Sequence, residues 1–206
     1  AIVEGPNEQT RAYLTAALVD DHAIQIDRSL QRFGGVYDLA SYEGHFYSDK
    51  APGSSLLAAP VYAIARTRQH TEAASATEIV NLARNWLMLP FALLGFCALR
   101  GLLRRLGRSP ASVDLISIAY SLGCAVLHYS TAFYGHVLVA TLLLVSLWCM
   151  ARAGVFSRDR ASEGTRSSRI SRCLTLAAAG LCAGFAGLTE YQATLVAVLF
   201  LVPVFS

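Results

Sequence analysis

Charged residues are scarce in this chain of 206 residues. They make up 15% of it, where a soluble domain usually has about 25%. Residues 115–151 contain no Asp, Glu, Lys or Arg, and residues 85–99, 173–189 and 191–206 are also free of them. A soluble fold of this size needs more polar surface. The shortage therefore argues against an ordinary soluble domain and predicts a membrane protein.

Lysine is also scarce, and the cysteines show no paired spacing. Lys50 is the only lysine, beside sixteen arginines. No CxxC spacing occurs and the cysteines all lie in apolar stretches, so we interpret them as small buried hydrophobic residues. They are Cys97, Cys124, Cys149, Cys173 and Cys182. The cysteines therefore do not indicate a redox compartment.

The apolar runs predict an all-α, polytopic membrane protein with about five transmembrane helices. One crossing of the hydrocarbon core takes about 20 residues, so the run 115–151 fits two crossings joined by a turn near residues 131–136. The predicted spans are residues 80–103, 111–131, 136–152 and 173–190, with a fifth from about 192. Residues 54–66 are apolar but short, and we expect an interfacial or re-entrant helix there.

Charge is distributed unevenly around these spans. Residues 1–50 carry eight acids and four bases, whereas residues 100–108 carry four arginines and residues 152–172 carry six. Basic clusters beside spans mark the cytoplasmic side, so nucleic-acid binding is a poor explanation for them. We expect residues 1–53 to be an extracytoplasmic loop containing short helices, and residues 152–172 to be a flexible cytoplasmic loop. The chain opens on Ala1 and closes inside an apolar run, which predicts an N-terminal fragment of a larger protein.

Four positions could carry chemistry. Lys50, a lone cation where the loop meets the apolar segment 54–66, suits either a lipid phosphate or ordinary snorkelling at a helix start. Glu8 and Arg11 share one helix face, as a surface ion pair or as an acid aimed at a substrate. Glu190 ends a predicted span on the outer side, where it is either functional or simply solvated.

Histidines flank the predicted outer turn. His128 and His136 lie eight residues apart around it. They are interpreted as hydrogen-bonding histidines in preference to metal ligands, because a metal site needs more ligands than the surrounding sequence offers.

The order of these features resembles the GT-C glycosyltransferases that use polyprenyl-phosphate sugars. The pattern is Pro6-Asn7-Glu8-Gln9-Thr10-Arg11, then Gly44-His45-Phe46-Tyr47-Ser48-Asp49-Lys50-Ala51-Pro52-Gly53. Further likenesses are Tyr134-Gly135-His136 and Gly184-Phe185-Ala186-Gly187-Leu188-Thr189-Glu190-Tyr191. The likeness is greatest to the bacterial membrane glycosyltransferases grouped with family 39, near the lipid A aminoarabinose transferases and the protein O-mannosyltransferases.

The resemblance implies an inverting transferase in the bacterial inner membrane. It implies transfer of a sugar from a polyprenyl-phosphate donor to a lipid, glycan or protein acceptor on the extracytoplasmic side. Glu8 is then the general base, and Lys50 and Arg11 stabilise the leaving phosphate. Tyr47, Asp49, His136 and Glu190 are the remaining candidate substrate-binding residues. Some members of the family use a divalent cation and others do not.

Two positions depart from the family pattern. Asn7 stands where the family commonly has Asp, so the base is Glu8, Glu4 or another acid of the loop. Glu190 stands where the family has Lys. Two other functions stay open: a transporter or flippase, and a non-catalytic membrane subunit of a complex.

Overall fold

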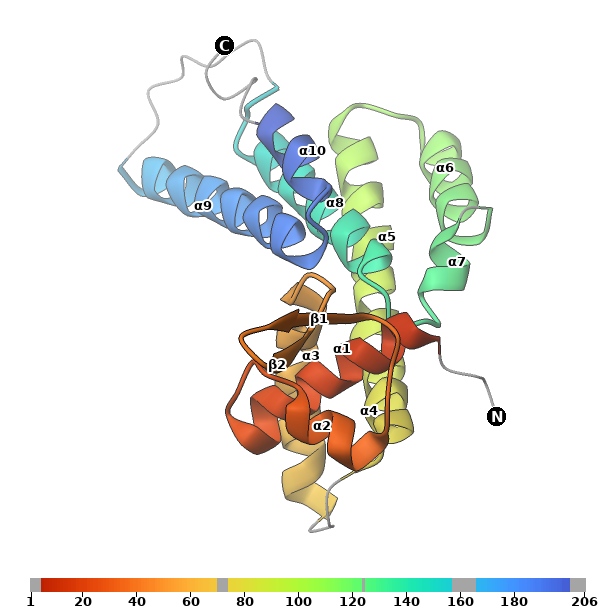
Figure 1. Cartoon of the computed structure of the whole chain (residues 1–206). Helices are drawn as coiled ribbons and strands as arrows, with labels where there is room; N and C mark the ends of the chain where they lie inside the picture. The colour runs from red at the N-terminus through yellow and green to blue at the C-terminus, as the bar shows by residue number, and fades with distance from the viewer. Residues whose placement is uncertain (1–4, 70–73, 124, 157–165, 201–206) are drawn as a thin grey trace. The chain divides into compact units, whose positions relative to one another are not determined.

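The chain folds mainly as helices, as the sequence predicts. The computed structural model describes residues 5–69, 74–123, 125–156 and 166–200, and within them only one pair of strands interrupts the helices (Figure 1). The chain divides into two compact units. The first is Ala1–Pro90 with His128–Gly135, and the second is Phe91–Leu127 with His136–Ser206.

The first unit opens with helix α1 (Pro6–Ala16), which continues as one π-helical turn, η1 (Ala17–Asp21). Pro6 suits the first helical position, where the N–H that proline lacks has no partner anyway. Helix α2 (Asp27–Phe33) then ends at Gly34, whose φ of 96° is open to glycine. An apolar cluster joins these elements and forms the core of the loop. Its buried members are Tyr13, Leu14, Ala17, Ile26 and Val36.

A β-hairpin follows, which the prediction of short helices in this loop did not include. Strand β1 (Leu39–Tyr42) pairs antiparallel with β2 (His45–Ser48). Glu43 and Gly44 form the turn with φ of 50° and 82°. Two consecutive positive φ values in a two-residue loop are typical of a type I′ turn, whose twist matches that of paired strands. Strand β2 ends at Ser48, two residues before Lys50.

The first unit also contains three further helical segments: α3 (Gly53–Gln69), α4 (Ala76–Ala83) and the π-helical turn η2 (Arg84–Met88). Ser75 and Glu78 form a capping box at the start of α4, which satisfies N–H groups that the helix itself cannot. Helix α1 packs against both α3 and α4. The predicted interfacial segment 54–66 is part of α3, which has 17 residues and contains Pro60.

The described part of the second unit consists of helices and their connections. Helix α5 (Leu89–Arg105) continues from η2, and α6 (Pro110–Leu122) and the short α7 (Ala125–Tyr129) follow it. Helices α8 (His136–Arg152) and α9 (Arg166–Thr189) pack side by side, and α10 (Ala193–Leu199) packs on α9 (Figure 1).

Small residues allow close helix contacts in the second unit. A Cβ added at Gly95 would lie 2.6 Å from Thr141 Oγ1, and one added at Gly187 would lie 2.6 Å from Thr194 Oγ1. Thr141 also donates a hydrogen bond of 2.8 Å to the carbonyl of Phe91. Glycine and threonine at helix contacts, with hydroxyls bonded across them, are typical of helices that pack in a membrane.

Two helices are long and apolar enough to cross a membrane, Ala76–Arg105 and Arg169–Thr189. The first contains the predicted span 80–103, and the second contains the predicted span 173–190 except for its last residue, Glu190. Only 22% and 11% of their most apolar windows are buried within the protein, whereas a core helix of a soluble protein is mostly buried. Apolar surface of this kind is what a membrane helix presents to lipid.

The prediction of about five transmembrane helices is not confirmed. Within the predicted span 111–131, α6 stops at Leu122 and Gly123 caps it, which leaves a helix of 13 residues. The predicted span 136–152 is α8, with 17 residues, at the lower limit of about 17–25 for a crossing. Residues 201–206 of the predicted fifth span lie outside the described residues.

Candidate functional site

Glu8 lies buried in the first unit with both carboxylate oxygens engaged. Arg84 donates from Nε to Oε1 at 3.0 Å and from a terminal nitrogen to Oε2 at 2.6 Å, and the backbone N–H of Phe133 donates to Oε1 at 2.6 Å. The side chains of Glu8 and Arg84 are 4% and 10% exposed. A general base must reach the proton that it removes. In this geometry the carboxylate instead ties α1 to η2 and to the turn at residues 130–135.

Arg11 joins α1 to the start of α3. Its Nε donates to Asn7 Oδ1 at 2.8 Å, and its terminal nitrogen donates to the hydroxyl of Ser54. In the other direction, the Ser55 hydroxyl donates to the Arg11 carbonyl at 2.9 Å. The Arg11 side chain is buried, with 1% of the residue exposed. It therefore holds the segment after Lys50 against α1, and it lies away from solvent.

Lys50 forms the centre of a half-buried ionic cluster. Its Nζ lies 3.2 Å from Asp38 Oδ2 and 3.0 Å from Asp49 Oδ2. Burial lowers the pKa of Lys50, but hydrogen bonds to Asp49 and Asp38 and their charges outweigh burial and raise that pKa above 10.5. The side chains of Lys50, Asp38 and Asp49 are 24%, 27% and 35% exposed. All three groups are thus within reach of a ligand from solvent or from the membrane surface.

The hairpin fixes the place of this cluster. Asp27 Oδ1 accepts from the N–H of Phe46 at 3.1 Å, and the N–H of Ile26 donates to the Phe46 carbonyl at 2.9 Å. These bonds hold β2 against the start of α2. Tyr47, one of the candidate substrate-binding residues, is half-buried on β2 opposite Ala40.

Asp20 is a second polar centre, which the sequence analysis did not single out. Its carboxylate accepts hydrogen bonds from Arg32 at 2.8 Å, from the hydroxyl of Tyr62 at 2.9 Å, and from Arg66. Its side chain is 10% exposed. Burial, then the Asp20 contact, raises the pKa of Tyr62 above 10.0. Since three donors occupy this carboxylate, it connects η1, α2 and α3 and has little capacity left for a ligand.

Two of the predicted site residues meet in the second unit. His136 Nδ1, at the start of α8, lies 4.0 Å from Glu190 Oε1, just after α9. The side chains are 51% and 21% exposed, so this contact is open to solvent or lipid head groups. The sequence predicted each residue separately, and the packing of α8 on α9 explains why they are close.

The structure adds residues that the sequence analysis missed: Arg84, Asp38 and Asp20. Arg84 had a usable signal, because it is the only charged residue between Glu78 and Arg100, and a charge in an apolar helix usually has a partner. No local sequence pattern marks Asp38 or Asp20, because their partners are distant in sequence. Glu4, the other candidate base, lies outside the described residues. Among the residues that the structure describes, no cluster of three His, Cys, Asp or Glu side chains is suited to hold a metal ion.

Comparisons with protein families, with curated proteins and with solved structures found no match to this chain. Any assignment of function therefore rests on the site itself and on the sequence pattern.

Proposed function

We propose that the chain is part of a membrane glycosyltransferase of the GT-C type, which transfers a sugar from a polyprenyl-phosphate donor to an acceptor outside the cytoplasm. The observation that carries this proposal is the cluster of Lys50, Asp38 and Asp49. It combines one cation and two accessible carboxylates at the junction with the apolar helix α3. Phosphate recognition and proton abstraction need these two kinds of group.

The proposed reaction is a single displacement. A carboxylate of the cluster takes the proton of the acceptor hydroxyl, and the oxygen attacks the anomeric carbon of the donor sugar. The bond from that carbon to the phosphate oxygen breaks with inversion, and the lipid phosphate leaves with the electron pair. Lys50 stabilises the charge that develops on this phosphate.

The base differs from the one that the family pattern favours. Glu8 has both oxygens bonded and is buried, whereas Asp38 and Asp49 are accessible. We assign the base to one of these two aspartates. When the donor phosphate approaches, Lys50 exchanges one carboxylate for it, and the released carboxylate becomes free to accept a proton.

The proposed placement in the membrane supports the same function. We propose that residues 1–53 lie on the extracytoplasmic side of a bacterial inner membrane, since the arginine clusters 100–108 and 152–172 in the sequence are typical of the cytoplasmic side. Lys50 then stands near the outer surface, where the phosphate of a polyprenyl carrier is found.

The test uses the full-length protein in proteoliposomes with a radiolabelled polyprenyl-phosphate sugar. Lys50→Ala should lower sugar release from the donor by about 10²–10³-fold, the usual loss when one donor to a developing anion is removed. Arg28→Ala is the matched control, because Arg28 is a basic residue of the same loop that is 78% exposed and paired with Asp21. Wild-type turnover by Lys50→Ala would refute the role of that residue.

Asparagine substitutions separate the two aspartates. The variant in which the true base is changed to Asn should lose most of the transferase activity. The other variant should keep the chemical step and bind the donor more tightly, because Lys50 has lost a competitor for the phosphate. Equal activity of Asp38→Asn and Asp49→Asn with wild type would exclude both as the base.

A non-catalytic membrane subunit is the second candidate function. It is favoured by the engagement of Glu8 with Arg84 and by Asn7 at the position where the family has a carboxylate. Full-length protein that releases no sugar from any polyprenyl-phosphate donor, but is required for assembly of a complex, would establish it. Movement of the lipid across the bilayer without a covalent product would instead support a flippase.

A further inference from the structure

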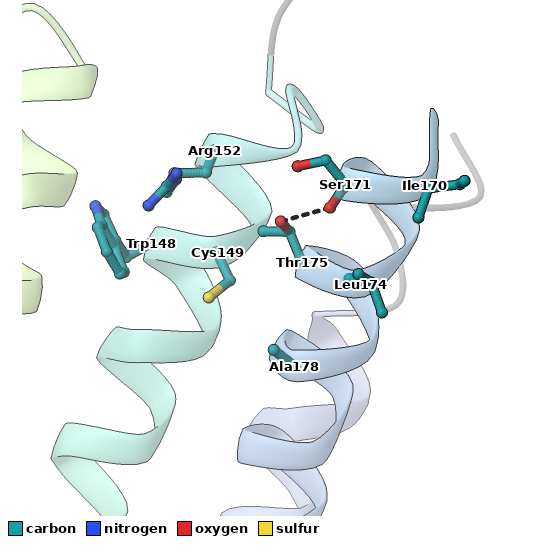
Figure 2. Close-up of a pocket in the computed structure, with 8 residues that line it drawn as sticks. All are labelled: Trp148, Cys149, Arg152, Ile170, Ser171, Leu174, Thr175 and Ala178. Carbon is teal, nitrogen blue, oxygen red and sulfur yellow. Dashed lines mark hydrogen bonds between the residues drawn. The ribbon is translucent and has the colours of Figure 1, made fainter. Parts of the chain in front are cut away.

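A groove of about 730 Å³ lies between α8 and α9, near Arg152, the last residue of α8 (Figure 2). It lies wholly within the second unit and is unrelated to the cluster around Lys50. It is open along one side. A volume of several hundred Å³ is typical of sites for small organic ligands.

One end of the groove is cationic and polar. The guanidinium carbon of Arg152 lies 5.2 Å from the centroid of the Trp148 ring, a cation–π contact. Arg152 forms no ion pair with any residue of the described ranges. Across the groove, Ser171 is exposed on α9, and its carbonyl accepts a hydrogen bond of 2.8 Å from Thr175 (Figure 2).

The rest of the groove is apolar. Leu174 and Ala178 line it from α9, and Leu174 is 66% exposed. The part of α9 that carries them, Arg169–Thr189, is long and apolar enough to cross a membrane. The groove therefore passes from a cationic end to a surface suited to hydrocarbon.

The sequence that links α8 to α9 has one sign of charge in excess. Residues 152–172 contain six arginines and two acids. A basic segment directly beside apolar helices is typical of the cytoplasmic side, where the leaflet is rich in anionic lipid. Basic pockets between membrane helices on that side bind anionic head groups.

We propose that this groove binds one anionic phospholipid. Arg152 holds the phosphate through its N–H groups, Trp148 orients the guanidinium, and Ser171 contacts the head group. One acyl chain lies along Leu174 and Ala178. The inference requires a membrane protein but does not depend on the transferase activity.

Photo-labelling tests this site. The full-length protein is reconstituted into phosphatidylcholine vesicles that contain a minor fraction of phosphatidylglycerol with a diazirine on its acyl chain, and labelled peptides are identified by mass spectrometry. We expect label on the α9 peptide that carries Leu174 and Ala178. Arg152→Gln should lower this labelling about fivefold, which corresponds to about 1 kcal/mol per basic residue near an anionic surface.

Two further variants separate binding at the groove from general effects. Arg108→Gln removes the same charge from an exposed arginine between α5 and α6 and should label as wild type does. Ala178→Phe fills the groove without changing charge and should also lose the label. Circular dichroism and elution volume are compared for every variant, so that a misfolded protein is recognised.

Three results would overturn the proposal. Equal losses for Arg152→Gln and Arg108→Gln would mean that only net charge matters. Equal labelling by the phosphatidylcholine analogue would mean that the groove does not select the head group. Unchanged labelling in folded Ala178→Phe would mean that the lipid lies elsewhere.

Discussion

The contact of Glu8 with Arg84 makes a strong prediction about stability. Glu8→Gln keeps the size and shape of the side chain but removes the charge that faces Arg84. The arginine then stays buried beside a neutral amide, without its compensating carboxylate. A buried cation without its partner is costly, so we expect the first unit to be markedly destabilised.

The magnitude follows from burial and geometry. Both side chains are at most 10% exposed, and two hydrogen bonds of 2.6 and 3.0 Å join them. Removing one partner of such a pair costs about 3–5 kcal/mol. The backbone N–H of Phe133 keeps an amide oxygen as acceptor in the Gln variant, so this bond adds little to the cost. We expect a loss of about 3 kcal/mol in the free energy of unfolding.

A double-mutant cycle is the appropriate assay. Unfolding is followed by circular dichroism during titration with a denaturing detergent, for wild type, Glu8→Gln, Arg84→Met and the double variant. Each single variant should lose stability, and the double variant should recover part of it, because no charge is then left buried. The coupling energy should reach about 2–3 kcal/mol. A coupling near zero would contradict a structural ion pair.

The same variants address catalysis. If Glu8 only holds the fold, activity should be lost in Glu8→Gln and regained in proportion to stability in the double variant. If Glu8 is the base, activity stays absent when stability returns. The second result would refute our assignment of the base to Asp38 or Asp49.

Two further predictions concern other parts of the chain. In thermal unfolding, Gly101→Ala should destabilise the second unit by about 1–3 kcal/mol, because the added Cβ would lie 2.6 Å from Trp148 Nε1. Gly180→Ala is the control, because its Cβ meets open space, and it should be neutral or slightly stabilising. Tyr62→Phe should cost about 1 kcal/mol at neutral pH by removing the bond to Asp20. Because the fold raises the pKa of Tyr62, this stabilisation is complete below pH 10.0 and is lost as pH rises through the raised pKa. The free energies of unfolding of wild type and variant should therefore converge in alkaline unfolding titrations. A constant difference between them would contradict this.

The sequence is most informative where a local pattern decides the structure. The apolar runs at residues 85–99 and 173–189 predict two long helices, and both are present. Gly34 ends α2 with a positive φ, which glycine adopts without strain. The hairpin also depends on a local signal, Gly44 between two short runs of apolar and aromatic residues. It was missed because Glu43, which also adopts a positive φ, is not a usual type I′ residue.

The candidate sites depend on contacts that no local pattern contains. Arg84 is 76 residues from Glu8, and Phe133 is 125 residues from it. The spacing of Glu8 and Arg11 suggested a pair on one helix face. That pattern describes a helix in isolation, whereas α1 is covered by α3 and α4. Tertiary packing therefore decided the partner.

The ionic cluster around Lys50 shows what such packing implies for a lone cation. A lysine at the start of an apolar helix can hold a phosphate only with the charge that its neighbours leave uncompensated. Here two aspartates surround it, so the cluster carries one net negative charge, and an approaching phosphate meets repulsion as well as Lys50. In the reaction that we propose, donor binding therefore separates Lys50 from at least one carboxylate. The released carboxylate is the proposed base, so in this proposal donor binding and activation of the base become one event. An acceptor that arrives first meets a carboxylate still paired with Lys50, and the proposed reaction is consequently ordered, with the lipid-linked donor binding before the acceptor.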